Sequence, residues 1–457
     1  MITRSFGHSF FSNSFFSHSL AIVATAMIAF VVFLPRGAAA IDIQRVTSPG
    51  GIEAWLVRDT SVPVISFNFA FPGGASVDPE RKEGRAEMVS GLLDEGAGDM
   101  TSQVFQRALE DSSASIRFSS ATDRFRGTLR TLSVNRDEAF RLLALAVNEP
   151  RFDAKPVERI RAQMVAGLRS SLQDPDTIAM RAWYGMVFPN HPYGRPNGGT
   201  IESLNTIRAG DLREFTSRYF VRKSLIVGVA GDITAEELRT RLDQVFGRLP
   251  MEGAARNIAD IKPAAGGKQV VVERNIPQSV VMFGHAGLRR TDPDWYTAYV
   301  MMRILGGGGF SSRLTEEVRE KRGLAYSVYS YLNPYDHAAL IMGGVATANA
   351  RVAESLDVIR AEWQRMADYG VTAEELASNK TYINGSFPLR LDSTGRIAGM
   401  LLAVQINRLG IDYLNSRDAL INKVTEEDIK RVAKRLLKPD ALTVVVVGKP
   451  KGLESTP

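Results

Sequence analysis

The chain of 457 residues contains no cysteine and only five histidines. Without thiols it can form neither disulfide bonds nor thiolate metal sites, and it cannot use a cysteine nucleophile. A large excess of charge is also missing, because 56 lysine and arginine residues oppose 50 aspartate and glutamate residues. The net charge of +6 comes without a dense basic stripe, so the sequence predicts no nucleic-acid binding. A hydrophobic fraction of 44% is ordinary for a globular protein, and the length predicts two to three domains.

Aspartate and glutamate are absent from the first forty residues. Within this segment, Arg4 precedes a fifteen-residue apolar run, Leu20–Leu34, and the small residues Ala38–Ala40 follow. This order predicts a signal peptide, residues 1–40, that is removed on export, and we expect the bacterial periplasm as the location. The alternative is an uncleaved anchor, although fifteen residues are few for a bilayer that needs about 20. No later stretch is long and apolar enough to span, so we expect no stable membrane span after cleavage.

The rest of the chain repeats itself with a period of about 215 residues. Val64–Pro79 is similar to Ser279–Pro293, and Asp211–Asp232 is similar to Asp428–Lys449, at offsets of 214 (79 to 293) and 217 (211 to 428) residues. In the second pair, a helical pattern leads into a short apolar run that we expect to be a strand, at residues 225–230 and 442–447. A period of this length indicates a duplicated domain rather than a solenoid.

Both copies mix helical and strand-like patterns. Apolar residues at helical spacing run from Val352 to Met366, Gly370 is placed to end that helix, and Thr372 and Glu375 form a capping-box pattern for the next one. Because strands and helices do not alternate strictly, we predict an α+β fold in which each half is a mostly antiparallel sheet covered by helices. The expected divisions are an N-terminal domain at 41–247, a linker at 248–268, a C-terminal domain at 269–450 and a tail at 451–457.

Four separate segments resemble one peptidase family. They are Gly74–Asp78, Gly84–Glu87, the HPYGRP sequence of His191–Pro196, and Leu305–Ser330. Together they resemble the insulinase/pitrilysin metallopeptidases, which include the mitochondrial processing peptidases. The resemblance spans nearly the whole chain after residue 40, and it implies a duplicated two-domain chain that forms half of a clamshell.

Catalytic members of this family carry an H-x-x-E-H motif on a helix, in which two histidines bind zinc and the glutamate activates water. At the corresponding positions this chain has Glu87, Ser90 and Gly91, and Gly167 stands in place of the more distant zinc ligand. The resemblance therefore implies that this chain holds no metal or cofactor and performs no zinc chemistry. We expect Glu87 to be a solvated helix residue and Gly91 to allow close helix packing.

Three histidines lie beyond the predicted signal peptide, so an atypical metal site is an alternative to weigh. His191, His285 and His337 have no partner at helical spacing, and His337 lies in a turn sequence, NPYDH. A lone histidine is more often a surface or capping residue than a ligand. We therefore do not expect a metal site on these residues.

The C-terminal half keeps the segment that faces the substrate in this family. Val318–Val328 resembles the family sequence that supplies an arginine and a tyrosine seven residues apart, here Arg319 and Tyr326. A phenol O–H can stabilise the oxyanion of peptide hydrolysis, and an arginine fork can hold a substrate carbonyl. The alternative is structural: Arg319 would pair with Glu316 or Glu320, and Tyr326 would lie in the sheet core.

Four consecutive glycines, Gly306, Gly307, Gly308 and Gly309, precede this segment. The residues after them lack the lysine and the spacing of a phosphate-binding loop. We expect a flexible turn that borders the binding cleft, and ordinary helix termination is the alternative.

These observations lead to one functional hypothesis and two alternatives. The chain would be the zinc-less subunit of a heterodimeric peptidase that hydrolyses peptides, and a related partner would carry the H-x-x-E-H motif and the zinc. This subunit would not be active alone and would contribute Arg319 and Tyr326 to the shared site. The alternatives are a catalytically inactive peptide-binding or scaffold protein, and a self-sufficient enzyme with an atypical site.

Overall fold

Two main β-sheets organise the computed structural model, which describes residues 41–264, 266–307 and 311–456. The predicted signal peptide, residues 1–40, lies outside the described residues, as do Gly308 and Gly309 of the glycine run. Residues Asp42–Pro457 form one compact unit. Within the described ranges, no helix is long and apolar enough to cross a membrane.

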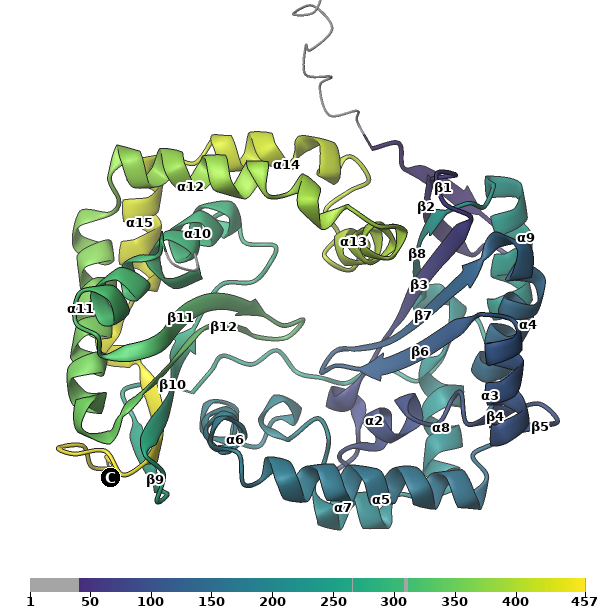
Figure 1. Ribbon diagram of the computed structural model, residues 1–457, viewed down its shortest axis with the longest axis horizontal. Coiled ribbons are helices and arrows are strands. Elements are labelled where there is room, and N and C mark those ends of the chain that lie inside the picture. Colours follow the sequence, from purple (N-terminus) through teal and green to yellow (C-terminus); the bar gives the residue numbers. More distant parts are fainter. Residues whose placement is uncertain (1–40, 265, 308–310, 457) are drawn as a thin grey trace, which may run out of the picture. The chain divides into compact units, whose positions relative to one another are not determined.

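The first sheet has six strands in the order β1-β2-β8-β3-β7-β6, and all neighbours are antiparallel except β2 and β8. Side chains alternate between its faces, so Phe67 and Phe69 of β3 point into a core that also contains Phe140 and Phe246. Those two residues come from α4 (Arg136–Asn148) and α9 (Ala235–Phe246), which cover this face (Figure 1). The strands are β1 (Gln44–Thr47), β2 (Glu53–Arg58), β3 (Val64–Pro72), β6 (Ser115–Ser120), β7 (Arg124–Leu132) and β8 (Ile226–Gly231).

The second sheet has five strands in the order β11-β12-β10-β13-β9, and only β13 and β9 are parallel. Its core face lies against three helices, where Phe283 and Trp363 pack edge to face with ring centres 6.1 Å apart. Two helix-covered, mostly antiparallel sheets confirm the predicted α+β class. The strands are β9 (Gln269–Glu273), β10 (Gln278–Ala286), β11 (Ala325–Pro334), β12 (Ala339–Ala348) and β13 (Thr443–Gly448), and the helices are α10 (Trp295–Met302), α11 (Val352–Tyr369) and α15 (Glu426–Leu436).

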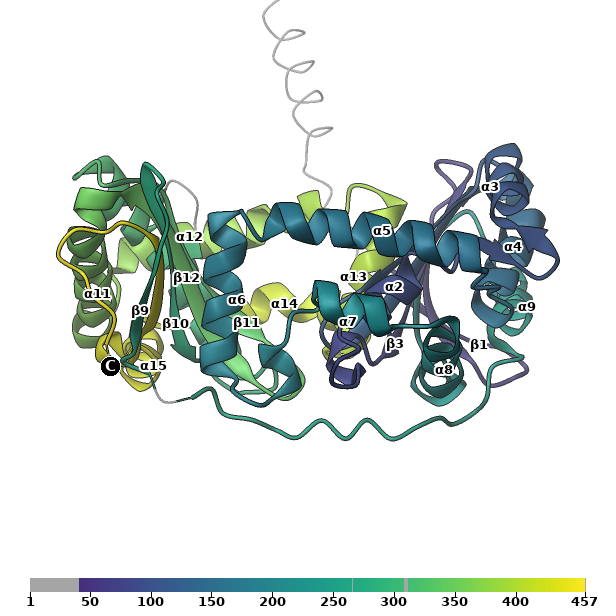
Figure 2. The same cartoon turned by 90° about the horizontal axis from the view of Figure 1, so that it is seen from below.

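Equivalent elements end both halves of the chain, as the repeat predicted. Helix α8 (Ala209–Tyr219) leads into β8 and α15 leads into β13, so each predicted strand is present and begins one residue later than expected. Thr372 and Glu375 form the predicted capping box at the start of α12 (Ala373–Gly385). Between α9 and β9, the described residues form no helix or strand (Figure 2).

Each half of the chain also covers the second face of the other half's sheet with one helix. Helix α6 (Pro175–Val187) packs on β13 and β10, and the indole N–H of Trp183 donates to the carbonyl of Thr443 at 3.0 Å. Helix α13 (Thr394–Ile406) packs on β8 and β3, where a Cβ at Gly228 would lie 2.6 Å from the carbonyl oxygen of Ala398. This exchange of helices buries both faces of the central strands and joins the two halves.

Two helices carry the positions that correspond to the zinc site. Glu87 and Ser90 lie on α2 (Arg85–Ser90), which ends at Gly91, and Gly167 lies on α5 (Ala154–Ser171). Further elements of the described residues are α3 (Ser102–Asp111), α7 (Ile201–Thr206), α14 (Tyr413–Asn422), β4 (Gly96–Ala97) and β5 (Met100–Thr101).

Candidate functional site

A buried carboxylate fixes the N-terminus of α2. Asp78 is 3% exposed and accepts hydrogen bonds from the backbone N–H groups of Gly84 and Ala86, each at 3.1 Å. The buried guanidinium of Arg85 pairs with the same carboxylate at 3.4 Å. Burial raises the pKa of Asp78 to about 7, although Arg85 and the N–H groups favour its charged form. Gly84 has a φ of 90°, and a Cβ there would lie 2.8 Å from the carbonyl oxygen of Gly198, so glycine is required at this entry to α2.

The polar side chains of α2 do not form a zinc site. Ser90 donates its hydroxyl to the carbonyl oxygen of Glu87 at 2.8 Å, so this hydroxyl is occupied by its own helix. Glu87 is half-buried rather than solvated, which corrects the expectation from the sequence, and burial raises its pKa. A catalytic zinc takes three protein ligands. These four positions offer only the carboxylate of Glu87, because the Ser90 hydroxyl is bonded to its own helix and Gly91 and Gly167 have no side chain, so they do not fit the metal. Among the described residues, no group of three histidine, aspartate or glutamate side chains could hold a metal ion.

The two glycines at the zinc-site positions differ in what surrounds them. A Cβ at Gly91 would lie 3.3 Å from Cγ2 of Ile160 in α5, so the small residue lets α2 and α5 approach, as expected. A Cβ at Gly167 would meet no atom within 4 Å. Packing therefore explains glycine at position 91, whereas nothing in the structure explains it at position 167.

Replacing Glu87 by glutamine is expected to stabilise the protein at pH 8 and to have a much smaller effect near pH 4. Burial raises the native pKa of Glu87 above its unfolded value, so the wild-type protein loses stability as the pH rises through that pKa. Glutamine is neutral at every pH and avoids this loss. Urea unfolding at both pH values measures the difference, and Glu110→Gln on exposed α3 is the matched control. A lower free energy of unfolding for Glu87→Gln at pH 8 would contradict the prediction.

Two of the three histidines flank the tyrosine of the HPYGRP sequence. His191 accepts the backbone N–H of Tyr193 through Nδ1 at 3.2 Å, and its Nε2 lies 3.1 Å from the carbonyl oxygen of Ala259 in the linker. The Tyr193 hydroxyl donates to Asp123 at 2.7 Å and accepts the backbone N–H of His337 at 3.1 Å. These bonds join the β6–β7 turn, the linker and the β11–β12 turn, so the motif has a structural role at the contact between the two halves.

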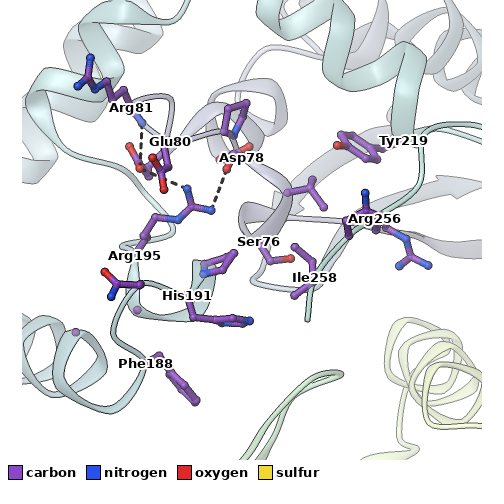
Figure 3. A pocket seen from close by; sticks show the side chains of 18 of the residues that line it. Ser76, Asp78, Glu80, Arg81, Phe188, His191, Arg195, Tyr219, Arg256 and Ile258 are labelled. Carbon is purple, nitrogen blue, oxygen red and sulfur yellow. Dashed lines mark hydrogen bonds and ion pairs between the residues drawn. The ribbon is translucent and has the colours of Figure 1, made fainter. Parts of the chain in front are cut away.

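A cavity of about 670 Å³ lies beside this junction (Figure 3). Its lining includes Asp78, His191, Arg195 and Arg256. The Arg195 guanidinium donates to the carbonyl oxygen of Asp78 at 3.0 Å (Figure 3). It also lies 3.6 Å from the carboxylate of Glu83. Because the lining combines both signs of charge and Arg195 is held by its neighbours, the cavity favours no single class of ligand.

Arg319 and Tyr326 lie together at the start of β11. Arg319 belongs to a π-helical turn, Thr315–Glu320, and its guanidinium carbon lies 4.8 Å from the ring centre of Tyr326. The pairing of β11 with β12 shifts its register at Tyr326, which therefore forms a β-bulge. Arg319 also pairs with Glu320 at 3.3 Å, which is one of the ion pairs that the structural alternative named. The other part of that alternative, a tyrosine in the sheet core, is wrong, because Tyr326 is 80% exposed. Both π-helical turns and β-bulges are frequent at functional sites.

The described part of the glycine run packs against the same strand. Gly306 and Gly307 end a second π-helical turn, Arg303–Gly307, and the Arg303 guanidinium donates to the carbonyl oxygen of Gly307 at 2.6 Å. A Cβ at Gly306 would lie 2.5 Å from Oγ of Ser330 in β11. Glycine is therefore needed at position 306 for close packing on the strand that carries Tyr326.

Two further exposed tyrosines lie on β11 and were not singled out from the sequence. Tyr329 and Tyr331 are each 41% exposed, and their rings stack with centres 6.0 Å apart. Their spacing of two residues in the sequence YSVYSYL was the available signal, because alternate residues of a strand share one face. The edge strand thus presents three tyrosines to solvent.

The fold and the site define a class: a duplicated α+β chain that resembles a zinc peptidase but lacks its zinc ligands. The family model described as the Peptidase M16 inactive domain matches residues 206–382. A crystal structure of a peptidase M16 inactive domain from Pseudomonas fluorescens is similar, with a TM-score of 0.84 and 27% identity over 91% of this chain and 99% of that one. These similarities confirm the resemblance to the M16 peptidases, and the segment at residues 206–382 matches the domain described as inactive.

Curated relatives cover most of the chain and carry two kinds of name. A Helicobacter pylori protein named non-peptidase homolog YmxG is 27% identical over 88% of this chain and 92% of its own length. An uncharacterized zinc protease of Streptomyces coelicolor is 25% identical over 86% of this chain and 87% of its own length. The crystal structure of a Helicobacter pylori protease shares the fold, with a TM-score of 0.80 at 19% identity over 90% of this chain and all of that one.

Proposed function

We propose that this chain is the zinc-less subunit of a two-chain metallopeptidase and that it supplies Arg319 and Tyr326 to a site whose zinc is bound by a related partner. One observation carries the proposal. The Arg319–Tyr326 pair is exposed on a β-bulge, with 4.8 Å between the guanidinium carbon and the ring centre, in a chain whose zinc-site positions hold no ligand set. A chain that had merely lost its zinc ligands would have no need to keep a tyrosine 80% exposed on a β-bulge beside an arginine.

The chemistry assigns separate tasks to the two chains. The partner's zinc would activate water for attack on a peptide carbonyl, which creates a tetrahedral oxyanion. The Tyr326 hydroxyl would donate a hydrogen bond to that oxyanion, and the Arg319 fork would hold a neighbouring substrate carbonyl. The stacking of Arg319 on the Tyr326 ring limits the rotamers of both side chains, which supports a preorganised site.

A second candidate function is an inactive peptide-binding or scaffold protein. The name of the Helicobacter pylori relative, a non-peptidase homolog, favours it. The two functions differ in their dependence on Tyr326, because a scaffold has no oxyanion to stabilise. We also propose that the chain acts after export, in the bacterial periplasm, because its first forty residues have the order of a signal peptide.

The decisive experiment is reconstitution with an M16 relative from the same organism that carries an intact H-x-x-E-H motif. The partner, this chain and their mixture are each assayed on a library of quenched fluorescent peptides. We expect cleavage by the mixture at least about 100-fold faster than by either chain alone, because the oxyanion donor is worth about this factor. A metal chelator should abolish the activity of the mixture.

Two results would reject the proposal. If the partner alone cleaves as fast as the mixture, this chain contributes nothing to catalysis and the scaffold function remains. If this chain alone cleaves peptides in a zinc-dependent way, it is a self-sufficient enzyme with a site not found among its described residues.

A further inference from the structure

One face of β6 and β7 carries a cluster of arginines. The register pairs Ser115 with Arg130, Arg117 with Thr128, and Ser119 with Arg126, and paired residues point to the same side of a sheet. Arg117, Arg126 and Arg130 are all exposed on this side. The opposite side carries the core residues of these strands, so the arginines share the face that turns away from the core. We call these three residues the arginine face.

The charge of the arginine face is not balanced by neighbouring carboxylates. Among the described residues, no aspartate or glutamate lies within ion-pair distance of Arg117, Arg126 or Arg130. Arg124, the next residue of β7 on this side, pairs with Asp336 of the β11–β12 turn. Although the Arg126 side chain reaches solvent, partial desolvation by the surrounding protein, and then the positive charge of Arg124, lower its pKa. A bound carboxylate would relieve this repulsion.

The position of the face suits an extended chain. Strand β6 ends the order of the sheet, so the backbone groups on its outer side can pair with an added strand. Helix α13 covers β8, β3 and β2 on this side, while the arginines stand on the two strands farthest from it (Figure 1). Side chains two residues apart on an added strand would stand about 7 Å apart and face the same way.

We propose that the arginine face binds acidic side chains of an extended peptide, so that this subunit selects peptides with acidic residues at alternate positions. The three cross-strand rows place Arg130 of β7, Arg117 of the edge strand β6 and Arg126 of β7 in succession along these two strands, and only small serines of β6 stand between Arg130 or Arg126 and the edge. If a peptide adds as a strand beside β6, glutamates at its positions i, i+2 and i+4 would each lie next to one of these three arginines. The inference deepens the proposed function, because it names the class of peptide that the two-chain enzyme would receive.

The geometry favours a peptide over a nucleic acid. Nucleic-acid grooves combine basic side chains with aromatic platforms for base stacking, whereas this face adds only serine and threonine to its arginines. Arginine forks bind carboxylates in a planar, bidentate way, which matches glutamate side chains that emerge from one face of a strand. The overall charge of +6 gave no hint of this preference, because the cluster exists only after β6 and β7 pair.

The test uses the purified chain alone and a fluorescein-labelled ten-residue peptide with glutamate at every second position. Fluorescence anisotropy at 50 mM salt measures its affinity for the wild type and for the variant Arg117→Gln/Arg126→Gln/Arg130→Gln. We expect binding at least tenfold weaker in the variant, and wild-type affinity that falls with added salt. The matched control Arg107→Gln/Arg169→Gln/Arg274→Gln removes the same charge from exposed sites on α3, α5 and the residue after β9, and it should bind within about twofold of wild type.

Several results would overturn the inference. These are equal loss of affinity in both triple variants, equally tight binding of a peptide with glutamine in place of glutamate, and tighter binding of a single-stranded oligonucleotide than of the acidic peptide. Loss of complex formation with the zinc-bearing relative, without loss of peptide binding, would assign the face to subunit contact instead. Because binding is measured without the partner, its outcome is separate from the peptidase assay: acidic peptides can bind even if the mixture proves inactive. Thermal unfolding of each variant confirms that it is folded.

Discussion

In the reconstituted two-chain enzyme, Tyr326→Phe is expected to lower kcat by about 10²- to 10³-fold, which is the cost of removing one oxyanion donor. The substitution deletes only the hydroxyl and keeps the ring on which Arg319 stacks. Substrate binding before the chemical step should therefore change little, and KM should stay within about threefold. Steady-state kinetics on one cleaved peptide give both constants. A loss confined to kcat would place the hydroxyl in the transition state rather than in substrate binding.

A second exposed tyrosine supplies the matched control. Tyr369, at the end of α11, is 76% exposed. Its replacement by phenylalanine also removes only a phenol hydroxyl, but at a residue outside β11. This variant should keep the wild-type kcat and KM. The proposed role of Tyr326 is refuted if Tyr326→Phe folds, joins the partner and retains full kcat. Unfolding midpoints for both variants should match the wild type, because neither hydroxyl is buried.

Repetition and local pattern were sufficient to predict the α+β class and several of its elements. The strands β8 and β13 and the capping box at Thr372 follow from short-range rules, which depend on residues close in sequence. The exchange of α6 and α13 could not be predicted in this way. It depends on contacts such as Trp183 with Thr443, which are 260 residues apart, and on the space left at Gly228 for α13.

The candidate site shows the same division between local and tertiary information. The resemblance of Val318–Val328 to the family segment singled out Arg319 and Tyr326. The exposure of Tyr326 could not be predicted in this way, because the β-bulge that presents it depends on how β11 pairs with β12. The sequence led us to expect a solvated helix residue at Glu87, yet the packing around α2 leaves it half-buried. The arginine face was missed for a similar reason, because Arg117 meets Arg126 and Arg130 only through strand pairing.

Removing the carboxylate of Asp78 is expected to lower the free energy of unfolding by about 3–5 kcal/mol, the usual cost of breaking a buried ion pair from one side. Asp78→Ala leaves the 2% exposed guanidinium of Arg85 without its closest carboxylate, because the other one, on Glu214, lies 3.9 Å away. It also removes the acceptor for the backbone N–H groups of Gly84 and Ala86 at the start of α2. Urea unfolding measures the loss. The control Asp137→Ala removes an exposed carboxylate that pairs with the half-buried Arg241, and it should cost no more than about 1 kcal/mol.

A double-mutant cycle separates the ion pair from the helix cap. Asp78→Asn keeps a carbonyl acceptor for the N–H groups but removes the charge, whereas Arg85→Met removes the partner and keeps much of its volume. Because burial raises the pKa of Asp78 to about 7, the pair gains less than its desolvation costs, and the double variant should be more stable than the sum of the single losses predicts. We expect a coupling free energy of about 1–3 kcal/mol. Strict additivity would mean that Asp78 holds α2 through its hydrogen bonds alone, and that Arg85 is held instead by the carbonyl oxygen of Val77 and the ring of Phe215.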